Sequence, residues 1–197
     1  KHTAPLDELE KEFAAYAKEK AEQLAPKLDW TRPEPELLLP EAAEKLADWK
    51  KDHPDNYWIL RLEAQRLMEQ QKWAEAKVPL ERLIELYPRQ KGSDSVYRSL
   101  VAAHRALNDG PAERAALQRW AENDDEATEA YLRLMELAAA EKDWPTVARN
   151  SQRYLAVNPL VPPPYRYLAQ ASAAMGDDSS AVVAWRTLLQ LDVPERA

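Results

Sequence analysis

Histidine is the residue type from which this chain would have to build a metal site, because its 197 residues contain no cysteine. The three histidines are His2, His53 and His104, and no two of them have the four-residue spacing that places a pair on one helix face. No H-E-x-x-H motif occurs. A metal site would need all three imidazoles and a carboxylate brought together from distant segments. We therefore expect ordinary surface or groove histidines and no metal.

Acidic residues and serines are numerous, but their positions suit helix caps better than an active site. The clusters Asp124–Asp125–Glu126 and Asp177–Asp178 each stand where a turn opens a helix. No G-x-S-x-G surrounds a serine, and the 3 glycines cannot form a glycine-rich phosphate loop. A general acid needs a carboxyl group in an apolar pocket, of which the sequence gives no sign. We predict a protein that is not an enzyme and uses no cofactor.

Charge and hydropathy narrow the classes of partner. The chain has 27 Lys and Arg against 34 Asp and Glu, a net charge of -7, which disfavours general binding to nucleic acid phosphates. No apolar run approaches the roughly 18 residues of a membrane-spanning helix, so we expect no membrane insertion. The absence of cysteine suits the cytoplasm and the bacterial periplasm equally, and the compartment stays open. Proteins and peptides remain as partners.

The elements that must position these residues are predicted to be helices. Most of the 15 prolines separate Ala-, Leu-, Glu- and Arg-rich segments, and no run alternates cleanly as a strand would. The pattern also repeats: Ala42 and Ala76 lie 34 residues apart, as do Pro54 and Pro88. One such unit divides into helices over 57–70 and 73–87, each with an apolar face. The prediction is an all-α chain of stacked helix pairs.

A 34-residue helix–turn–helix unit with a closing proline resembles the tetratricopeptide repeat. The resemblance implies a right-handed α-solenoid, with repeats at about 57–90, 128–161 and 162–195, a looser one at 96–127, and a half repeat at 39–56. It also implies a concave groove, lined by the first helices, that binds a peptide or a partner helix. The residues that carry the resemblance are Ala64, Trp73, Ala76, Leu80, Pro88, Tyr131, Leu134, Trp144, Tyr154, Pro159, Tyr165, Leu168, Ala169, Gly176, Ala181 and Trp185.

The same resemblance selects the candidate groove residues. Trp58, Arg61, Arg133 and Arg166 are expected to face a common channel, and three arginines there would favour a ligand with carboxylates. The alternative is that the preceding helices fill the groove and cover Trp58. The chaperone-binding version of the fold is disfavoured, because its asparagines are absent. The full candidate set is Trp58, Arg61, Gln65, Tyr97, His104, Arg133, Glu136, Arg166, Tyr167 and Gln170.

Most of the 7 tryptophans are expected in the core instead. Trp73 and Trp144 occupy the aromatic position that opens a second helix of the repeat. Trp185 matches the packing position of Leu80, and Trp49 matches a stacked position in the half repeat. By this register only Trp58 faces the groove.

The N-terminal part is expected to be separate from the repeats. Residues 5–25 predict one helix with an apolar stripe, and 26–38 an extended, proline-rich connector. We expect the helix to cap the lone helix at 41–51.

Two segments of the N-terminal part carry a second, faint resemblance. They are FAAYAKEKAEQLAPKLDW and TRPEPE, and they resemble the segment that joins a zinc-peptidase-like domain to C-terminal repeats in large bacterial proteins. That resemblance implies an accessory region of a larger enzyme, with a further N-terminal domain. A self-associating structural solenoid is a third hypothesis.

Overall fold

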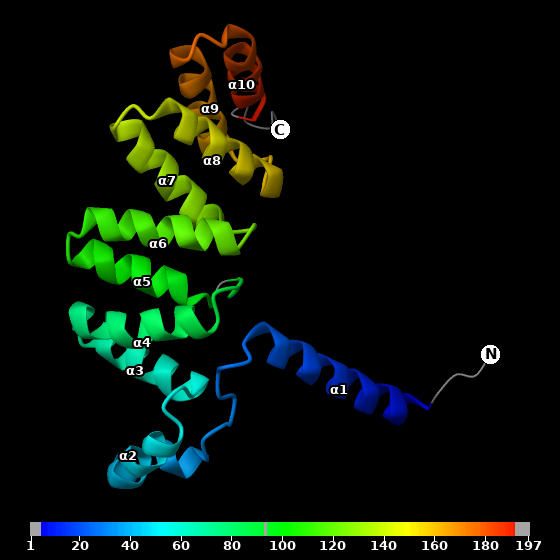
Figure 1. The fold of residues 1–197 in the computed structure, drawn as a ribbon. Helices are drawn as coiled ribbons and strands as arrows, with labels where there is room; N and C mark the ends of the chain where they lie inside the picture. The colour runs from blue at the N-terminus through cyan, green and yellow to red at the C-terminus, as the bar shows by residue number, and fades with distance from the viewer. Residues whose placement is uncertain (1–4, 93, 192–197) are drawn as a thin grey trace, which may run out of the picture. The chain divides into compact units, whose positions relative to one another are not determined.

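A computed structural model describes residues 5–92 and 94–191 and shows an all-α protein of TPR-like helix pairs with an additional N-terminal helix (Figure 1), as the sequence predicts. Within these residues no strand occurs, and an isolated bridge joins Asp29 to Asn56. The helices are α1 Leu6–Leu24, α2 Ala43–Asp52, α3 Tyr57–Glu69, α4 Trp73–Leu86, α5 Val96–Ala106, α6 Gly110–Asn123, α7 Thr128–Ala140, α8 Trp144–Val157, α9 Pro162–Ala174 and α10 Asp178–Leu191, and the 3-10 segments are η1 Pro35–Leu38 and η2 Pro40–Ala42.

The turn inside each helix pair has a common construction. The residue that leaves the first helix has positive φ in all four turns, at Gln71, Asn108, Lys142 and Gly176. In the last three pairs an aspartate follows, and its carboxylate accepts a hydrogen bond from the first turn of the second helix. Because Asn108, Lys142 and Gly176 are 34 residues apart, the period is regular there. It lengthens to 37 residues between Gln71 and Asn108.

The contacts divide the chain into two compact units, Lys1–Arg89 and Gln90–Ala197. In the second unit, helices α5 to α10 pack on one another in chain order. Its core holds the fully buried Tyr97, Leu117, Tyr131 and Met135, and a smaller cluster around Val147 between α7, α8 and α9. The domain limits predicted from the sequence stay a prediction, and residues 192–195 of the last predicted repeat lie outside the described part.

In the first unit, the connector is fixed by a polar clasp at the start of α3. The Asn56 side chain accepts hydrogen bonds from the amides of Trp58 and Ile59, and its Nδ2 donates to the Thr31 carbonyl at 2.7 Å. Asp29 Oδ2 lies 2.6 Å from His53 Nδ1, and its Oδ1 accepts from the Thr31 amide. Burial alone would raise the pKa of Asp29, but the hydrogen bonds from Thr31, Asn56 and His53 outweigh it and hold that pKa well below its usual range.

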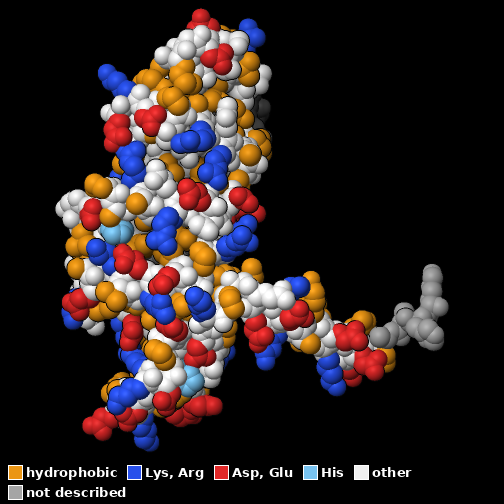
Figure 2. Space-filling model, in the orientation of Figure 1, with side chains coloured by type: hydrophobic (Ala, Val, Ile, Leu, Met, Phe, Trp, Pro, Cys, Tyr) orange, Lys and Arg blue, Asp and Glu red, His pale blue; other side chains and the backbone are white. Residues whose placement is uncertain are grey.

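The N-terminal helix does not form the predicted cap. All described side chains of α1 are exposed, including the apolar stripe of Leu6, Leu9, Phe13 and Tyr16. The half-repeat helix α2 packs instead on η1 and η2, and Leu46 is buried there. Figure 2 shows the orange apolar side chains of α1 interleaved with acidic and basic ones. The connector therefore covers α2, and it leaves α1 with an unburied stripe.

Pro79 lies inside α4, as it does in the helix predicted over 73–87, and it is buried in the unit's core. One further expectation is corrected. Trp185 is not a core residue: 40% of its surface is exposed, because α10 ends the described stack and no later helix covers it. Trp49 is partly buried and stacks on the His53 ring at 3.9 Å between centroids. Trp73 and Trp144 are half-buried.

Candidate functional site

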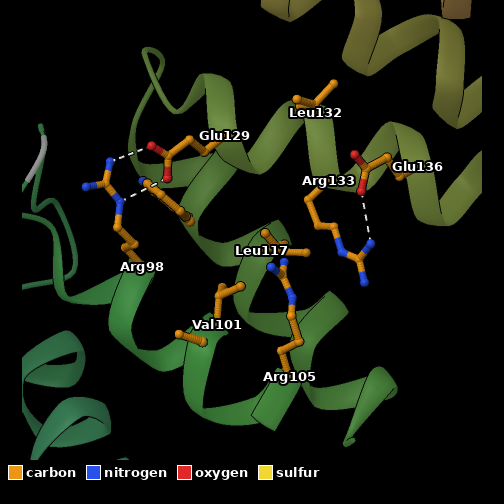
Figure 3. Close-up of a pocket in the computed structure, with 10 residues that line it drawn as sticks. Arg98, Val101, Arg105, Leu117, Glu129, Leu132, Arg133 and Glu136 are labelled. Carbon is orange, nitrogen blue, oxygen red and sulfur yellow. Dashed lines mark hydrogen bonds and ion pairs between the residues drawn. The ribbon is translucent and has the colours of Figure 1, made fainter. Parts of the chain in front are cut away.

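The second unit contains a cavity of about 300 Å³ between α5, α6 and α7. Apolar side chains form its floor, and charged side chains from α5 and α7 form its rim. Figure 3 shows Val101 and Leu117 between two ion pairs of the rim, Arg98–Glu129 and Arg133–Glu136. Leu132 lies above them on α7. The residues that line it are Arg98, Val101, Ala102, Arg105, Leu117, Trp120, Glu129, Leu132, Arg133 and Glu136.

Ion pairs hold the rim in place. Arg98 on α5 donates to both carboxylate oxygens of Glu129 on α7, at 2.9 and 2.7 Å (Figure 3). Glu113 of α6 does not line the cavity, but its carboxylate accepts hydrogen bonds from two arginines that do, from Arg105 Nε at 3.0 Å and from Arg133 Nε at 2.8 Å. A planar guanidinium fixes such geometry through paired N–H donors. The side chains that rim the cavity are therefore ordered before any ligand binds.

Glu113 is the centre of this arrangement. Only 5% of its side-chain surface is exposed, yet it remains a carboxylate between two arginines. Burial would raise its pKa, but the hydrogen bonds from Arg133 and then Arg105 outweigh burial and lower it below its ordinary value. The same contact, with a further hydrogen bond to Glu136 at 2.9 Å, raises the pKa of Arg133. The site therefore holds a fixed, mixed array of charges and not an excess of positive charge.

The structure assigns two of the predicted groove residues to the interior. Tyr97 on α5 is completely buried, and burial raises the pKa of its hydroxyl. His104, two residues before the end of α5, is also buried. Neither side chain presents a surface to a ligand, which corrects the expectation that both face the groove. The reason is that α5 turns these positions toward its neighbours and its Arg98 and Arg105 toward the cavity.

The predicted residues of α7 and α9 have different positions. Arg133 and Glu136 line the cavity. Tyr167 is half-buried against the cluster of Ala138, Val147 and Ala171, and burial first and Glu136 second raise its pKa. Arg166 and Gln170 are exposed on α9. The structure thus brings Arg133, Glu136 and Tyr167 into one neighbourhood of the second unit.

The predicted residues of α3 belong to the first unit. Trp58 is 39% exposed, and the Arg32 guanidinium lies over its ring at 5.2 Å. Arg61 donates to the Tyr57 hydroxyl at 2.7 Å. Gln65 is exposed and donates to Glu69 of the same helix. The connector supplies Arg32, so a preceding segment does partly cover Trp58. That Trp58, Arg61, Arg133 and Arg166 share a channel stays a prediction.

The sequence did not identify Arg98, Arg105 or Glu113 as site residues. Arg98 and Arg105 are one helix position beyond the predicted Tyr97 and His104, so a register shift of one residue in the looser repeat would have found them. Glu113 belongs to the second helix of its repeat, whose faces the repeat pattern assigns to packing.

Among the described residues, no group of three or more His, Asp and Glu could hold a metal ion, and no helix is long and apolar enough to cross a membrane. His2 lies outside these residues.

Comparison with known proteins supports the fold. No protein-family model matches the chain, and no curated protein matches it. One crystal structure of MamA is 19% identical, covers 77% of this chain and 85% of its own, and has a TM-score of 0.53. A second structure of MamA is 18% identical, covers 77% and 81%, and has a TM-score of 0.54. The resemblance to a zinc peptidase finds no support there. At these identities the likeness concerns the fold alone, which is a TPR-like helical repeat.

Proposed function

We propose that this protein is a non-catalytic interaction module that binds a peptide or a partner helix in the groove of its second unit. The observation that supports the proposal is the cavity between α5 and α7, with an apolar floor and an ordered, ion-paired rim. Its volume of about 300 Å³ accommodates one or two large side chains. An apolar anchor in a pocket, surrounded by polar groups, is the usual arrangement at the energetic centre of an interface.

The rim suggests what kind of ligand fits. Each arginine that lines the cavity already has a carboxylate partner within the unit, at Glu113, Glu129 or Glu136. A ligand that carried carboxylates alone would have to compete with these pairs. We therefore propose an apolar anchor residue with polar or mixed-charge neighbours, in place of the acidic ligand predicted from the sequence. The accessory-region hypothesis is not needed for this function.

Substituting an apolar residue that lines the cavity should remove binding. Leu132→Glu is expected to weaken binding of a selected peptide at least tenfold, because a carboxylate would replace the apolar contact and lack a partner there. Peptides with one central Leu, Phe or Trp, displayed as a library, would be selected on the intact chain, and affinity measured by fluorescence anisotropy. Leu160→Glu is the matched control, since Leu160 is 75% exposed and does not line the cavity.

A companion variant tests the charge of the ligand. The double variant Arg98→Gln with Glu129→Gln removes the exposed ion pair of the rim without changing the net charge. It should not change the preference between acidic and neutral peptides that share the anchor, because Arg98 is already paired with Glu129. A strong preference for acidic peptides that disappears in this double variant would restore the carboxylate ligand. If Leu132→Glu and Leu160→Glu bound every selected peptide equally, the groove between α5 and α7 would not be the binding site.

A further inference from the structure

The last helix pair among the described residues, α9 and α10, presents an apolar face of its own. Val182, Trp185 and Leu189 of α10 follow one another at the spacing that places them on one side of a helix. All three are exposed, Leu189 to 69%. Between Ser179 and Leu191 the only charged residue is Arg186, which is also exposed. The outer surface of α10 is therefore an apolar stripe with one positive charge.

The earlier repeats show which kind of element packs on the corresponding face of a second helix. Counted from the aspartate that precedes each second helix, Trp185 corresponds to Leu117 of α6 and to Ser151 of α8, and both of these are buried. Helix α7 packs on α6, and α9 packs on α8. In both cases the covering helix, α7 or α9, is the first helix of the next pair. By continuity of this stacking, the face of α10 fits one more amphipathic helix.

The chain itself contains such a helix. In α1, Leu6, Leu9, Phe13 and Tyr16 form a stripe with alternating steps of three and four residues, and the whole described helix is exposed. The charges also match. Residues 6–24 hold six acidic side chains against three basic ones, whereas the α10 face carries only Arg186. Pairing two α1 helices would bring two acidic surfaces together, and pairing two α10 faces would oppose two arginines.

We propose that α1 of one copy docks on the Val182–Trp185–Leu189 face of α10 in a second copy. A second copy is favoured over the same chain, because Ala25 and Leu28 are buried in the first unit and fix the start of the connector directly after α1. Within the second unit, the pairs α5/α6 and α7/α8 precede α9/α10 in the stack. Two helix pairs of the second unit therefore lie between α10 and Gln90, where the chain enters this unit. The interface is head-to-tail in character and uses a surface separate from the proposed peptide groove.

The test uses two single variants of the full chain. Phe13→Glu charges the α1 stripe, and Leu189→Glu charges the α10 face. Both residues are highly exposed, so neither change disturbs the fold of a single copy. Light scattering coupled to size exclusion, over a range of concentrations, should show species heavier than the 22.5 kDa chain for the wild type. Each variant alone should associate at least tenfold more weakly, and Leu160→Glu should behave as the wild type.

Mixing the variants decides between the possible pairings. Phe13→Glu retains an intact α10 face, and Leu189→Glu retains an intact α1, so the mixture should regain association that neither variant shows alone. A wild type that is monomeric at every concentration would overturn the proposal. Association lost in Phe13→Glu alone would instead indicate α1 pairing with α1, and loss in Leu189→Glu alone would indicate α10 pairing with α10. A mixture that stays monomeric would equally contradict the interface.

Discussion

Asn56→Ala is expected to lower the free energy of unfolding of the first unit by about 2–4 kcal/mol. The side chain is fully buried and joins two segments that are 25 or more residues apart in sequence. Its Oδ1 caps the start of α3, and its Nδ2 donates to the Thr31 carbonyl and to Asp29. Alanine would leave the α3 amides and the Thr31 carbonyl without these partners in a buried place, and would release the connector.

Hydrogen exchange gives the most direct measurement. The amides of Trp58 and Ile59, which donate to Asn56, should exchange faster in Asn56→Ala, together with the Tyr57 amide that bonds to the Asp29 carbonyl. Asn123→Ala is a matched control, because Asn123 is partly exposed and its side chain donates to the Arg119 carbonyl of its own helix. Equal exchange rates at Trp58 and Ile59 in the wild type and Asn56→Ala would contradict the importance of the clasp.

The helices of this protein could be predicted because their signals are local. The apolar spacing, the caps and the closing prolines all lie within a few residues of the element that they define, and Tyr57 and Trp73 begin helices where the sequence placed them. Asp177 acts as the predicted cap of α10. The clasp was not predictable in the same way. Asn56 could be identified as a cap, but its partners Asp29 and Thr31 lie in a connector whose sequence indicates only an extended segment.

The residues of the candidate site divide in the same way, into those that a local repeat pattern predicts and those that depend on contacts between distant segments. Arg133 and Glu136 were found because they belong to a well-matched repeat, whose register fixes the face of α7. The predicted positions of Tyr97 and His104 were wrong. Both belong to the looser repeat, and both lie within the one irregular interval among the described turns, the 37 residues between Gln71 and Asn108. Glu113 could not be found from periodicity, because a buried glutamate is tolerated only when distant arginines reach it. Arg105 and Arg133 lie 8 and 20 residues away.

Replacing Glu113 should have the largest effect within the second unit. Glu113→Ala is expected to cost about 2–3 kcal/mol, since it removes a buried carboxylate that accepts charge-assisted hydrogen bonds from two arginines. The loss stays below that of a fully buried ion pair, because Arg105 and Arg133 are themselves partly exposed and can be rehydrated. Glu129→Gln is the control: it breaks the exposed pair with Arg98 and should cost less than about 1 kcal/mol.

The effect of Glu113 should depend on pH with a defined sign. The pKa of this carboxyl is lowered in the folded protein from its ordinary value of 4.5, so the folded state holds the proton less tightly than the unfolded state. Its contribution to stability is therefore complete above about pH 4.5, and it is lost as the pH falls through the lowered folded-state pKa. Urea unfolding of the wild type and Glu113→Gln at a series of pH values would measure this. The difference between the two free energies should be constant near neutral pH and should shrink in acid. A difference that grew as the pH fell would mean that Glu113 binds its proton more tightly when folded, and the ion pairs of Glu113 with Arg105 and Arg133 would then be wrong.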